Sequence, residues 1–278
     1  MGRQFTRMVA DASRKCNLAG IVSPRLNERL DGRVTSHQLK LRVTMKTRVL
    51  VPELMDDPDL DRAAHFRALA GLQRINRWTH NASLAWRQVE RLAKQRGLDR
   101  IRVLDIATGA ADIPIKLLSR AEAAGLTLDI EACDISKEAL ELAEANCDRV
   151  DASIRLLTLD VLNEPITAEY DVVLCSQFLH HLTDRQTEGV LGKMATAATY
   201  RVIVVDLVRS QLNWWQVWLA TRVLSRSSVV HFDGPQSVRA AFTVKEMKMI
   251  AERVGFARFS ITSHWPCRFT LVGDTSSF

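Results

Sequence analysis

Short apolar runs separated by helical stretches dominate the sequence after Gly97. Each helical stretch is long enough to carry the chain back across a sheet, so consecutive strands are predicted to be parallel. The last two runs have no helix between them and are predicted to be antiparallel. The pattern predicts an α/β fold, a doubly wound, seven-stranded and mostly parallel sheet. The expected strands are 101–106, 126–133, 154–159, 170–175, 202–206, 256–263 and 267–272.

Helix start and stop signals fall between these runs. Ser136 stands before the helical stretch 137–147 as an expected N-cap. Thr183 with Gln186, and Thr243 with Glu246, have the spacing of capping boxes that open two further helices. Gly255 is expected to end the last of these helices.

The basic character of the chain belongs to its first residues. The net charge is +6, but residues 1–48 hold 11 Lys and Arg against three acidic residues, which leaves 27 basic and 29 acidic residues in the rest. Residues 1–51 are therefore interpreted as a basic, disordered leader, or as sequence upstream of a true start near Met45. The nearly neutral remainder argues against specific nucleic-acid binding.

The domain organisation follows from these patterns. Residues 52–97 are predicted to form an N-terminal helical cap of two amphipathic helices, and residues 98–278 the α/β domain. The stretch 207–242 is longer than a usual crossover and is interpreted as an insertion.

The environment of the protein is predicted from cysteine usage and from the absence of long apolar runs. Five scattered cysteines without a C-x-x-C motif are typical of a reducing compartment. No apolar run reaches the ~20 residues of a transmembrane helix, and the first residues lack the apolar core of a signal peptide. A cytoplasmic location is expected. No metal site is predicted, because the histidines are dispersed except for His180 and His181.

A small-residue turn follows the first expected strand. The segment from Asp105 to Ala111 reads D-I-A-T-G-A-A and lacks the G-x-G-x-x-G of a dinucleotide site. It resembles the first motif of class I S-adenosylmethionine-dependent methyltransferases, D/E-x-G-x-G-x-G, with alanine at two glycine positions. Acidic residues also end the second and third strands, and the fourth strand runs into Ser176-Gln177-Phe178-Leu179-His180-His181-Leu182, as in small-molecule members of that superfamily such as the quinone or polyketide branch.

The resemblance implies S-adenosylmethionine as the cofactor. Asp105 and the turn 107–111 are expected to hold its methionine end, and Asp134 its ribose. Asp160 and Val161 would lie at the adenine, although Asp160 also fits an ordinary strand-end turn. The cofactor-binding residues predicted in this way are Asp105, Ala107, Thr108, Gly109, Ala111, Asp134, Ile135, Asp160, Val161, Ser176 and Gln177.

The acceptor is expected on the far side of the sulfonium. One of His180 and His181 is predicted to act as a base or to bind the acceptor, and adjacent residues are not expected to point the same way. The resemblance implies that the insertion 207–242 lies on the acceptor side. Its helical stretch 211–226 is rich in tryptophan, and Trp215, His231 and Arg239 are acceptor-side candidates. An apolar or aromatic small molecule, methylated on oxygen or carbon, is the predicted acceptor, and a homo-oligomer is left open.

Two other readings stay open at this point. An RNA or protein methyltransferase would use the same cofactor, but amino-methylating members often carry N/D-P-P-Y/F where this chain has Ser176-Gln177-Phe178-Leu179. A non-catalytic methyltransferase-like module is suggested by the two alanines of the first motif. A nicotinamide-dependent enzyme is disfavoured, because the glycine fingerprint is missing.

Overall fold

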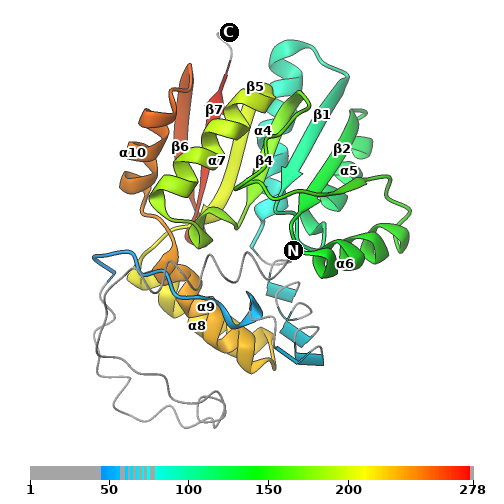
Figure 1. Ribbon diagram of the computed structural model, residues 1–278. Helices are drawn as coiled ribbons and strands as arrows, with labels where there is room; N and C mark the ends of the chain where they lie inside the picture. Colours follow the sequence, from blue (N-terminus) through cyan, green and yellow to red (C-terminus); the bar gives the residue numbers. More distant parts are fainter. Residues whose placement is uncertain are drawn as a thin grey trace, which may run out of the picture.

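The computed structural model describes residues 45–56 and 79–275, with scattered positions between residues 60 and 75. Its centre is a seven-stranded sheet in the order β3-β2-β1-β4-β5-β7-β6, in which only β7 runs against its neighbours (Figure 1). This confirms the predicted fold class. The strands are β1 (Arg100–Ile106), β2 (Thr127–Asp134), β3 (Arg155–Thr158), β4 (Tyr170–Ser176), β5 (Ala198–Leu207), β6 (Arg258–His264) and β7 (Arg268–Asp274).

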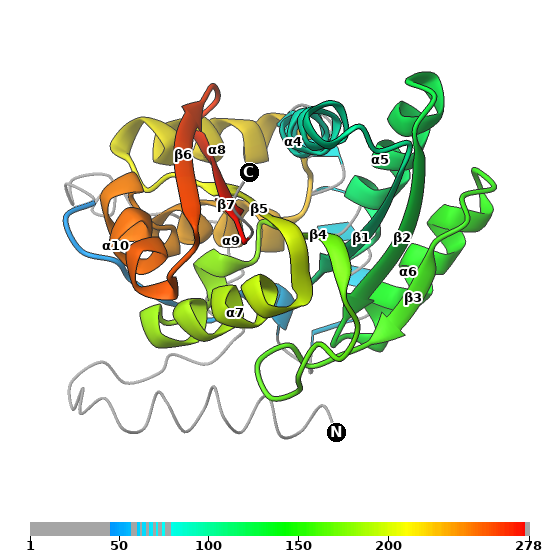
Figure 2. The same cartoon turned by 90° about the horizontal axis from the view of Figure 1, so that it is seen from above.

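Helices cover both faces of the sheet (Figure 2). On one face lie α7 (Asp184–Ala197) and α10 (Val244–Val254). On the other lie α4 (Asn81–Arg96), α5 (Asp112–Ala123) and α6 (Lys137–Asp148). The second of the two predicted N-terminal helices is α4, and it packs on the sheet; the first lies mostly outside the described residues.

Strand periodicity explains this three-layer packing. Leu104, Val173 and Val204 lie in the core under α7 and α10, whereas their chain neighbours Val103 and Val172 lie in the core under α4 and α5. Side chains alternate between the two faces of a strand, and here both faces are buried. The central strands are therefore apolar throughout, which is why they read as continuous apolar runs in the sequence.

The predicted helix ends are confirmed. Ser136 Oγ accepts a hydrogen bond from Ala139 N at 3.1 Å. Both capping boxes form, at Thr183 with Gln186 and at Thr243 with Glu246. Gly255 ends α10 with a φ of 81°, a backbone conformation that favours glycine.

The stretch 207–242 contains two helices, α8 (Gln211–Leu224) and α9 (Ser228–Ala240), packed against each other at the carboxyl-terminal end of the parallel strands (Figure 1). Only α8 was predicted, because Gly234-Pro235 is a typical turn signal. The helix continues through this pair. A β-carbon at residue 234 would lie 2.7 Å from Thr221 Cγ2, so glycine is what allows α9 to approach α8.

One stripe of α8 faces away from this packing. Leu212, Trp215, Leu219 and Val223 are 57%, 46%, 57% and 71% exposed, at helical spacing. The opposite side of α8, with Trp214 and Val217, packs against the cluster that includes Leu207 and Val238. The insertion is therefore buried along one side only.

The residues before α4 are attached to the insertion. Val49 N donates a hydrogen bond to Arg239 O at 3.1 Å. The short 3-10 helix η2 (Leu54–Asp56) begins on the carboxylate of Asp233, which accepts hydrogen bonds from Leu54 N at 2.8 Å and Met55 N at 3.1 Å. The predicted end of the leader at residue 51 is therefore wrong, since residues 45–51 belong to the folded part. Residues 1–44 lie outside the described residues.

The described cysteines form no disulfide. Cys133, Cys147, Cys175 and Cys267 are free, and the first three are buried. Among the described helices, none combines the length and apolarity needed to cross a membrane.

The α8–α9 contact generates a stability prediction. Gly234→Ala and Gly192→Ala each replace a helical glycine, which favours the helix by up to about 1 kcal/mol. No atom lies within 4 Å of a β-carbon at residue 192, on α7, whereas Gly234→Ala overpacks α8 at a cost of ~1–3 kcal/mol. In urea unfolding, Gly192→Ala is expected to be the more stable variant by that difference. Equal unfolding midpoints would contradict the packing.

Candidate active site at the carboxyl ends of the strands

The turn after β1 lies where the sheet order reverses, between β1 and β4. Ala107, Gly109 and Ala111 all have positive φ, at 53°, 57° and 58°. These are the three positions at which the methyltransferase motif has glycine. Thr108 N donates to Cys133 O at 3.0 Å and so ties the turn to β2. The turn therefore has the backbone shape expected of a glycine turn, although two alanines stand in it.

Asp105 lies beneath this turn and is 2% exposed. Its Oδ2 accepts a hydrogen bond from Thr108 Oγ1 at 2.6 Å, while Oδ1 is buried without a partner among the described residues. Burial raises the pKa of Asp105 to about 7, against the hydrogen bond from Thr108, and the nearby Asp134 raises it slightly more. A cationic ligand group would stabilise the ionised form of this carboxyl.

Asp134 ends β2 and holds two backbone amides. Its Oδ2 accepts from Gly109 N at 2.9 Å and its Oδ1 from Ser136 N at 2.9 Å. Burial raises its pKa, and these amides oppose the rise. The carboxylate thus joins the turn after β1 to the start of α6, and each oxygen keeps a lone pair for a ligand hydroxyl.

Ser176 and Gln177 follow at the end of β4. Ser176 Oγ is buried without a partner in the part of the chain that the structure describes. Gln177 has a φ of 54°, and its amide donates to Val205 O at 2.9 Å. Ile106 of β1 is in register with Cys175 of β4, so Asp105 and Ser176 end adjacent strands. Buried polar atoms without partners at this edge are what a polar ligand would satisfy.

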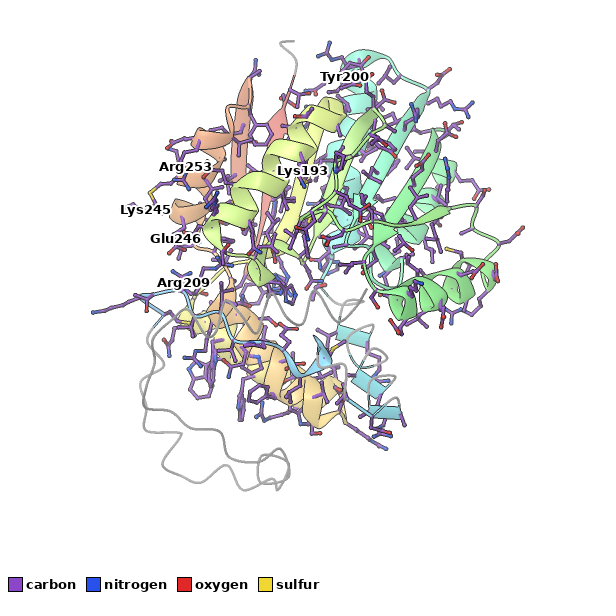
Figure 3. The ribbon with its side chains drawn as sticks, in the orientation of Figure 1. Lys193, Tyr200, Arg209, Lys245, Glu246 and Arg253 are labelled. Carbon is purple, nitrogen blue, oxygen red and sulfur yellow. The ribbon has the colours of Figure 1, made fainter. Side chains whose placement is uncertain are left out.

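The residues predicted at the adenine have mixed surroundings. Asp160 Oδ1 accepts from Leu162 N at 3.0 Å and Oδ2 from Asn163 Nδ2 at 2.7 Å, the arrangement of a turn residue. Val161 is 6% exposed in the core, and Ile135 is 42% exposed. The loop is anchored from α7 by Lys193 (Figure 3), whose ammonium donates to the carbonyls of residues 161, 162 and 164.

His180 is paired with a buried aspartate. It lies on the 3-10 helix η3 (Leu179–His181), is 4% exposed, and its Nδ1 lies 2.7 Å from Oδ1 of Asp206 near the end of β5. A carboxylate only accepts hydrogen bonds, so the proton is on Nδ1 and Nε2 is the nitrogen left for a ligand. Burial lowers the pKa of His180, but Asp206 outweighs burial and raises it. In turn, burial raises the pKa of Asp206, and His180 reverses this and lowers it.

His181 lies beside His180 rather than opposite to it. The ring centroids are 4.2 Å apart and the planes are inclined by 33°. This differs from the expectation that adjacent residues point apart: successive positions on a helical turn differ by about 120°, not 180° as in a strand, so the rings can converge. Nδ1 of His181 is 3.9 Å from Oε1 of Glu53, on the N-terminal segment.

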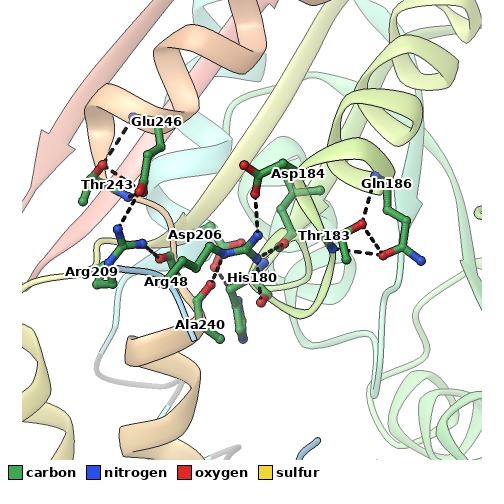
Figure 4. A network of polar contacts seen from close by, with 12 residues as sticks. Arg48, His180, Thr183, Asp184, Gln186, Asp206, Arg209, Ala240, Thr243 and Glu246 are labelled. Carbon is green, nitrogen blue, oxygen red and sulfur yellow. Dashed lines mark hydrogen bonds and ion pairs between the residues drawn. The ribbon is translucent and has the colours of Figure 1, made fainter. Parts of the chain in front are cut away.

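Arg48 holds the N-terminal segment against this site (Figure 4). Its guanidinium donates to Asp184 Oδ1 at 3.0 Å, to His180 O at 3.0 Å and to Ala240 O, and it stacks over the ring of Phe242. Burial lowers its pKa, although Asp184 opposes this. One side chain thus joins the N-terminal segment to η3, α7 and α9.

The three acceptor-side candidates lie in the insertion and do not come together. His231 Nε2 is 2.9 Å from Ser225 O, within the α8–α9 connection. Arg239 Nη1 donates to Gln236 Oε1 at 2.9 Å. Trp215 is on the exposed stripe and makes edge contacts with Trp214 and Trp218. The acceptor-side roles of these three residues remain predictions.

Sequence reasoning missed Asp206, Glu53 and Arg48. Asp206 had a usable signal, an acid at the end of an apolar strand whose neighbour β4 carries the histidines. Glu53 fell within the predicted helical cap, 52–97, and Arg48 within the basic leader. The partners of Arg48 and Glu53 are more than a hundred residues away in the sequence, so no local pattern predicts these contacts.

A hollow of about 1100 Å³ lies elsewhere, between α5 and the amino-terminal ends of β1, β2 and β4. Ligands of such sheets bind at the carboxyl ends of the strands. The candidate site is therefore the edge that carries Asp105, Asp134 and the two histidines, and not this hollow.

Residues 103–200 match the family described as methyltransferase domain. Of the curated relatives, the release factor glutamine methyltransferase of Lactococcus lactis subsp. lactis (strain IL1403) is 35% identical over 86 residues. A Schizosaccharomyces pombe protein named as a mitochondrial N(5)-glutamine methyltransferase is 37% identical over 83 residues. These matches cover 31% and 28% of this chain, and the chain spans 30% and 26% of the two relatives.

Solved structures share the fold. The plantazolicin methyltransferase BpumL in complex with a triazolic desmethylPZN analog and SAH superposes with a TM-score of 0.60 at 13% identity, over 77% of this chain and 97% of that chain. The S-adenosylmethionine-dependent methyltransferase SibL gives a TM-score of 0.50 at 20% identity, over 63% and 50% of the two chains. Because the sequence identities are only 13% and 20%, these superpositions show a shared fold and no more.

The family match from β1 to the start of β5 and the names of the relatives agree on a methyltransferase domain, and the solved structures share its fold. These findings agree with the predicted enzyme class and cofactor. The roles of the individual site residues stay predictions.

The first prediction at this site concerns Asp134. Asp134→Ala removes the expected hydrogen bonds to the ribose and is expected to weaken S-adenosylhomocysteine binding by about ten- to a hundredfold, since a hydrogen bond to a charged group contributes ~1.5–3 kcal/mol. Asp129→Ala is the matched control, because it removes a carboxylate at the other end of the same strand, where Asp129 pairs with exposed Arg100. Titration calorimetry measures the affinity of both variants for S-adenosylhomocysteine. Equal affinities would show that Asp134 does not bind the cofactor.

The second prediction is a pH dependence. Asp105 is expected to pair with the cationic methionine end of the cofactor, and only its ionised form does so. With a pKa of about 7, the ionised fraction falls about tenfold between pH 8 and pH 6, and the affinity for S-adenosylmethionine should fall with it. In Asp105→Asn the affinity should be lower and nearly flat over this range. A parallel pH profile in the variant would exclude this role.

The raised pKa of Asp105 also affects the folding stability of the cofactor-free protein. Ionisation of Asp105 at higher pH lowers this stability, whereas it raises the affinity for the cofactor. Because the folded-state pKa lies above the ordinary value of 3.8, the folded protein binds the proton more tightly. Asp105 therefore lowers the free energy of unfolding increasingly as the pH rises from about 4 to 7. In a thermal melt at neutral pH, Asp105→Asn should unfold at a higher temperature than the parent.

Proposed function

We propose that this protein transfers the methyl group of S-adenosylmethionine to an oxygen or carbon of a small apolar or aromatic acceptor. The cofactor would lie over the turn 107–111, held by Asp105 and Asp134. The acceptor would lie beyond β4, between the histidines of η3 and the insertion helix α9. The observation that carries the acceptor side is the buried pair of His180 and Asp206 at the end of β4 and β5, 2.7 Å apart.

The residues after β4 support a small-molecule acceptor. The cofactor supplies an activated methyl group, so the protein has to align the acceptor and exclude water. Asp206 Oδ1 orients the ring of His180 through its Nδ1, and Asp206 Oδ2 accepts a hydrogen bond from the backbone amide of His180 at 3.2 Å. His180 and His181 would hold the polar group of the acceptor, with the apolar side chains of the insertion around its remainder.

A protein methyltransferase is the second candidate, and the two curated relatives favour it by name. They match less than a third of this chain. Ser176-Gln177-Phe178-Leu179 follows β4 in place of the proline-containing tetrapeptide with which amino-methylating enzymes clamp a planar amide or amine. We therefore favour an acceptor hydroxyl or carbon over a glutamine amide.

An acceptor screen tests the proposal. The full chain is incubated with methyl-labelled S-adenosylmethionine and with phenols, quinone precursors and polyketides in one series, and with glutamine-containing peptides and RNA in another. Labelled product is expected only from the aromatic or apolar small molecules, as read by mass spectrometry. A preference for the peptides or for RNA would overturn the acceptor class while leaving the cofactor site standing.

A further inference from the structure

We propose that Glu53, His180 and His181 form a binding site for a divalent transition-metal ion of the zinc type. The three side chains come from two distant parts of the chain, the segment before α4 and the 3-10 helix η3. This deepens the proposed function, on which it rests, because the ion would hold an oxygen of the acceptor beside the cofactor.

The geometry of the cluster carries the inference. One ligand atom from each of the three residues lies within 4.8 Å of the other two, and Nδ1 of His181 is 3.9 Å from Oε1 of Glu53. Tetrahedral ligands ~2.1 Å from zinc lie about 3.4 Å from one another. Small side-chain rotations therefore bring the three atoms onto one ion. Two imidazoles and one carboxylate form the ligand set of catalytic zinc and of non-haem iron sites, which keep a position open for substrate.

The surroundings of the cluster are those of a metal site. Metal-bound histidines usually donate their other ring nitrogen to a carboxylate, which fixes the tautomer. Asp206 does this for His180, and it leaves Nε2 as the ligand atom. Ser237 Oγ donates to Glu53 Oε1 at 2.5 Å and orients the carboxylate. Hydrogen bonds from Leu54 and Met55 to Asp233 hold the backbone next to Glu53.

The local charges favour a cation. Arg48 is a cation near the cluster, but it pairs with Asp184 at 3.0 Å and directs its guanidinium to the carbonyls of Leu179 and His180. Asp206 pairs with His180 and interacts with the buried Arg268. The carboxylate of Glu53, 3.9 Å from Nδ1 of His181, is then the negative charge that would stabilise a metal ion at the two imidazoles.

Zinc binding to the full chain, with any affinity tag removed, tests the inference. The protein is stripped with a chelator and titrated with Zn²⁺ against a chromophoric competitor, and Co²⁺ is used as a second probe through its visible absorption. The parent chain is expected to bind one ion. Glu53→Gln and His181→Ala, which change the less buried ligands, are each expected to weaken binding at least about tenfold. His264→Ala, which changes a histidine on β6 outside the cluster, should bind as the parent does.

Two outcomes would overturn the inference: no stoichiometric binding by the parent chain, or equal affinities of the parent and both ligand variants. Thermal melting and S-adenosylhomocysteine binding of Glu53→Gln and His181→Ala are measured alongside and are expected to match the parent, which shows that the loss is local. The titration needs neither cofactor nor acceptor. Its failure is therefore distinguishable from a failure of the proposed methyl transfer.

Discussion

The parallel register of β1, β2, β4 and β5 is the constraint on which the site depends. It brings the ends of four strands to one edge, so Asp105, Asp134, Ser176 and Asp206 become neighbours although a hundred residues separate the first from the last. The strands can align in this way because both faces of the sheet are apolar and are covered by helices. Polar groups then concentrate where the strands stop, and each must find a partner there. Asp134 finds backbone amides and Asp206 finds His180, whereas Asp105 and Ser176 each keep one buried atom that no described residue satisfies.

The second half of the site is built from residues that lie outside this repeating pattern. The insertion helices and the segment 45–56 lie at the same end of the sheet and are fastened to each other through buried polar contacts (Figure 4). Arg209 adds a further connection, since its guanidinium donates to Ala241 O at 2.6 Å, to Glu246 Oε1 at 2.6 Å and to Met45 O at 3.1 Å. A buried guanidinium donor without a partner is costly, so the contact of Arg209 with Met45 O helps to hold the N-terminal segment on the structure beneath it.

Local sequence signals predicted the sheet well and the N-terminal side of the site poorly. Apolar runs, capping boxes and Gly255 each depend on a few adjacent residues, and all appear where the sequence placed them. The cofactor turn was found for the same reason. In contrast, α9 was missed because Gly234-Pro235 is a turn signal in isolation, and only the approach of Thr221 explains the glycine. Arg48 was assigned to the leader and Glu53 to the helical cap, because a basic or acidic residue shows its role only when its distant partner is known.

The two alanines of the turn were the reason to consider a module that has lost its cofactor. The structure shows that both alanines adopt the backbone conformation expected of glycine at these positions. Ala107 and Ala111 keep the positive φ angles that glycine would adopt, at a cost of roughly 1–2 kcal/mol each. Such a conformation persists only where neighbouring contacts impose it, and here Asp134, Cys133 and Asn146 bind the backbone of the turn at residues 109, 108 and 110. These contacts hold the turn in the backbone shape of the glycine motif. The two alanines are therefore compatible with the proposed cofactor site.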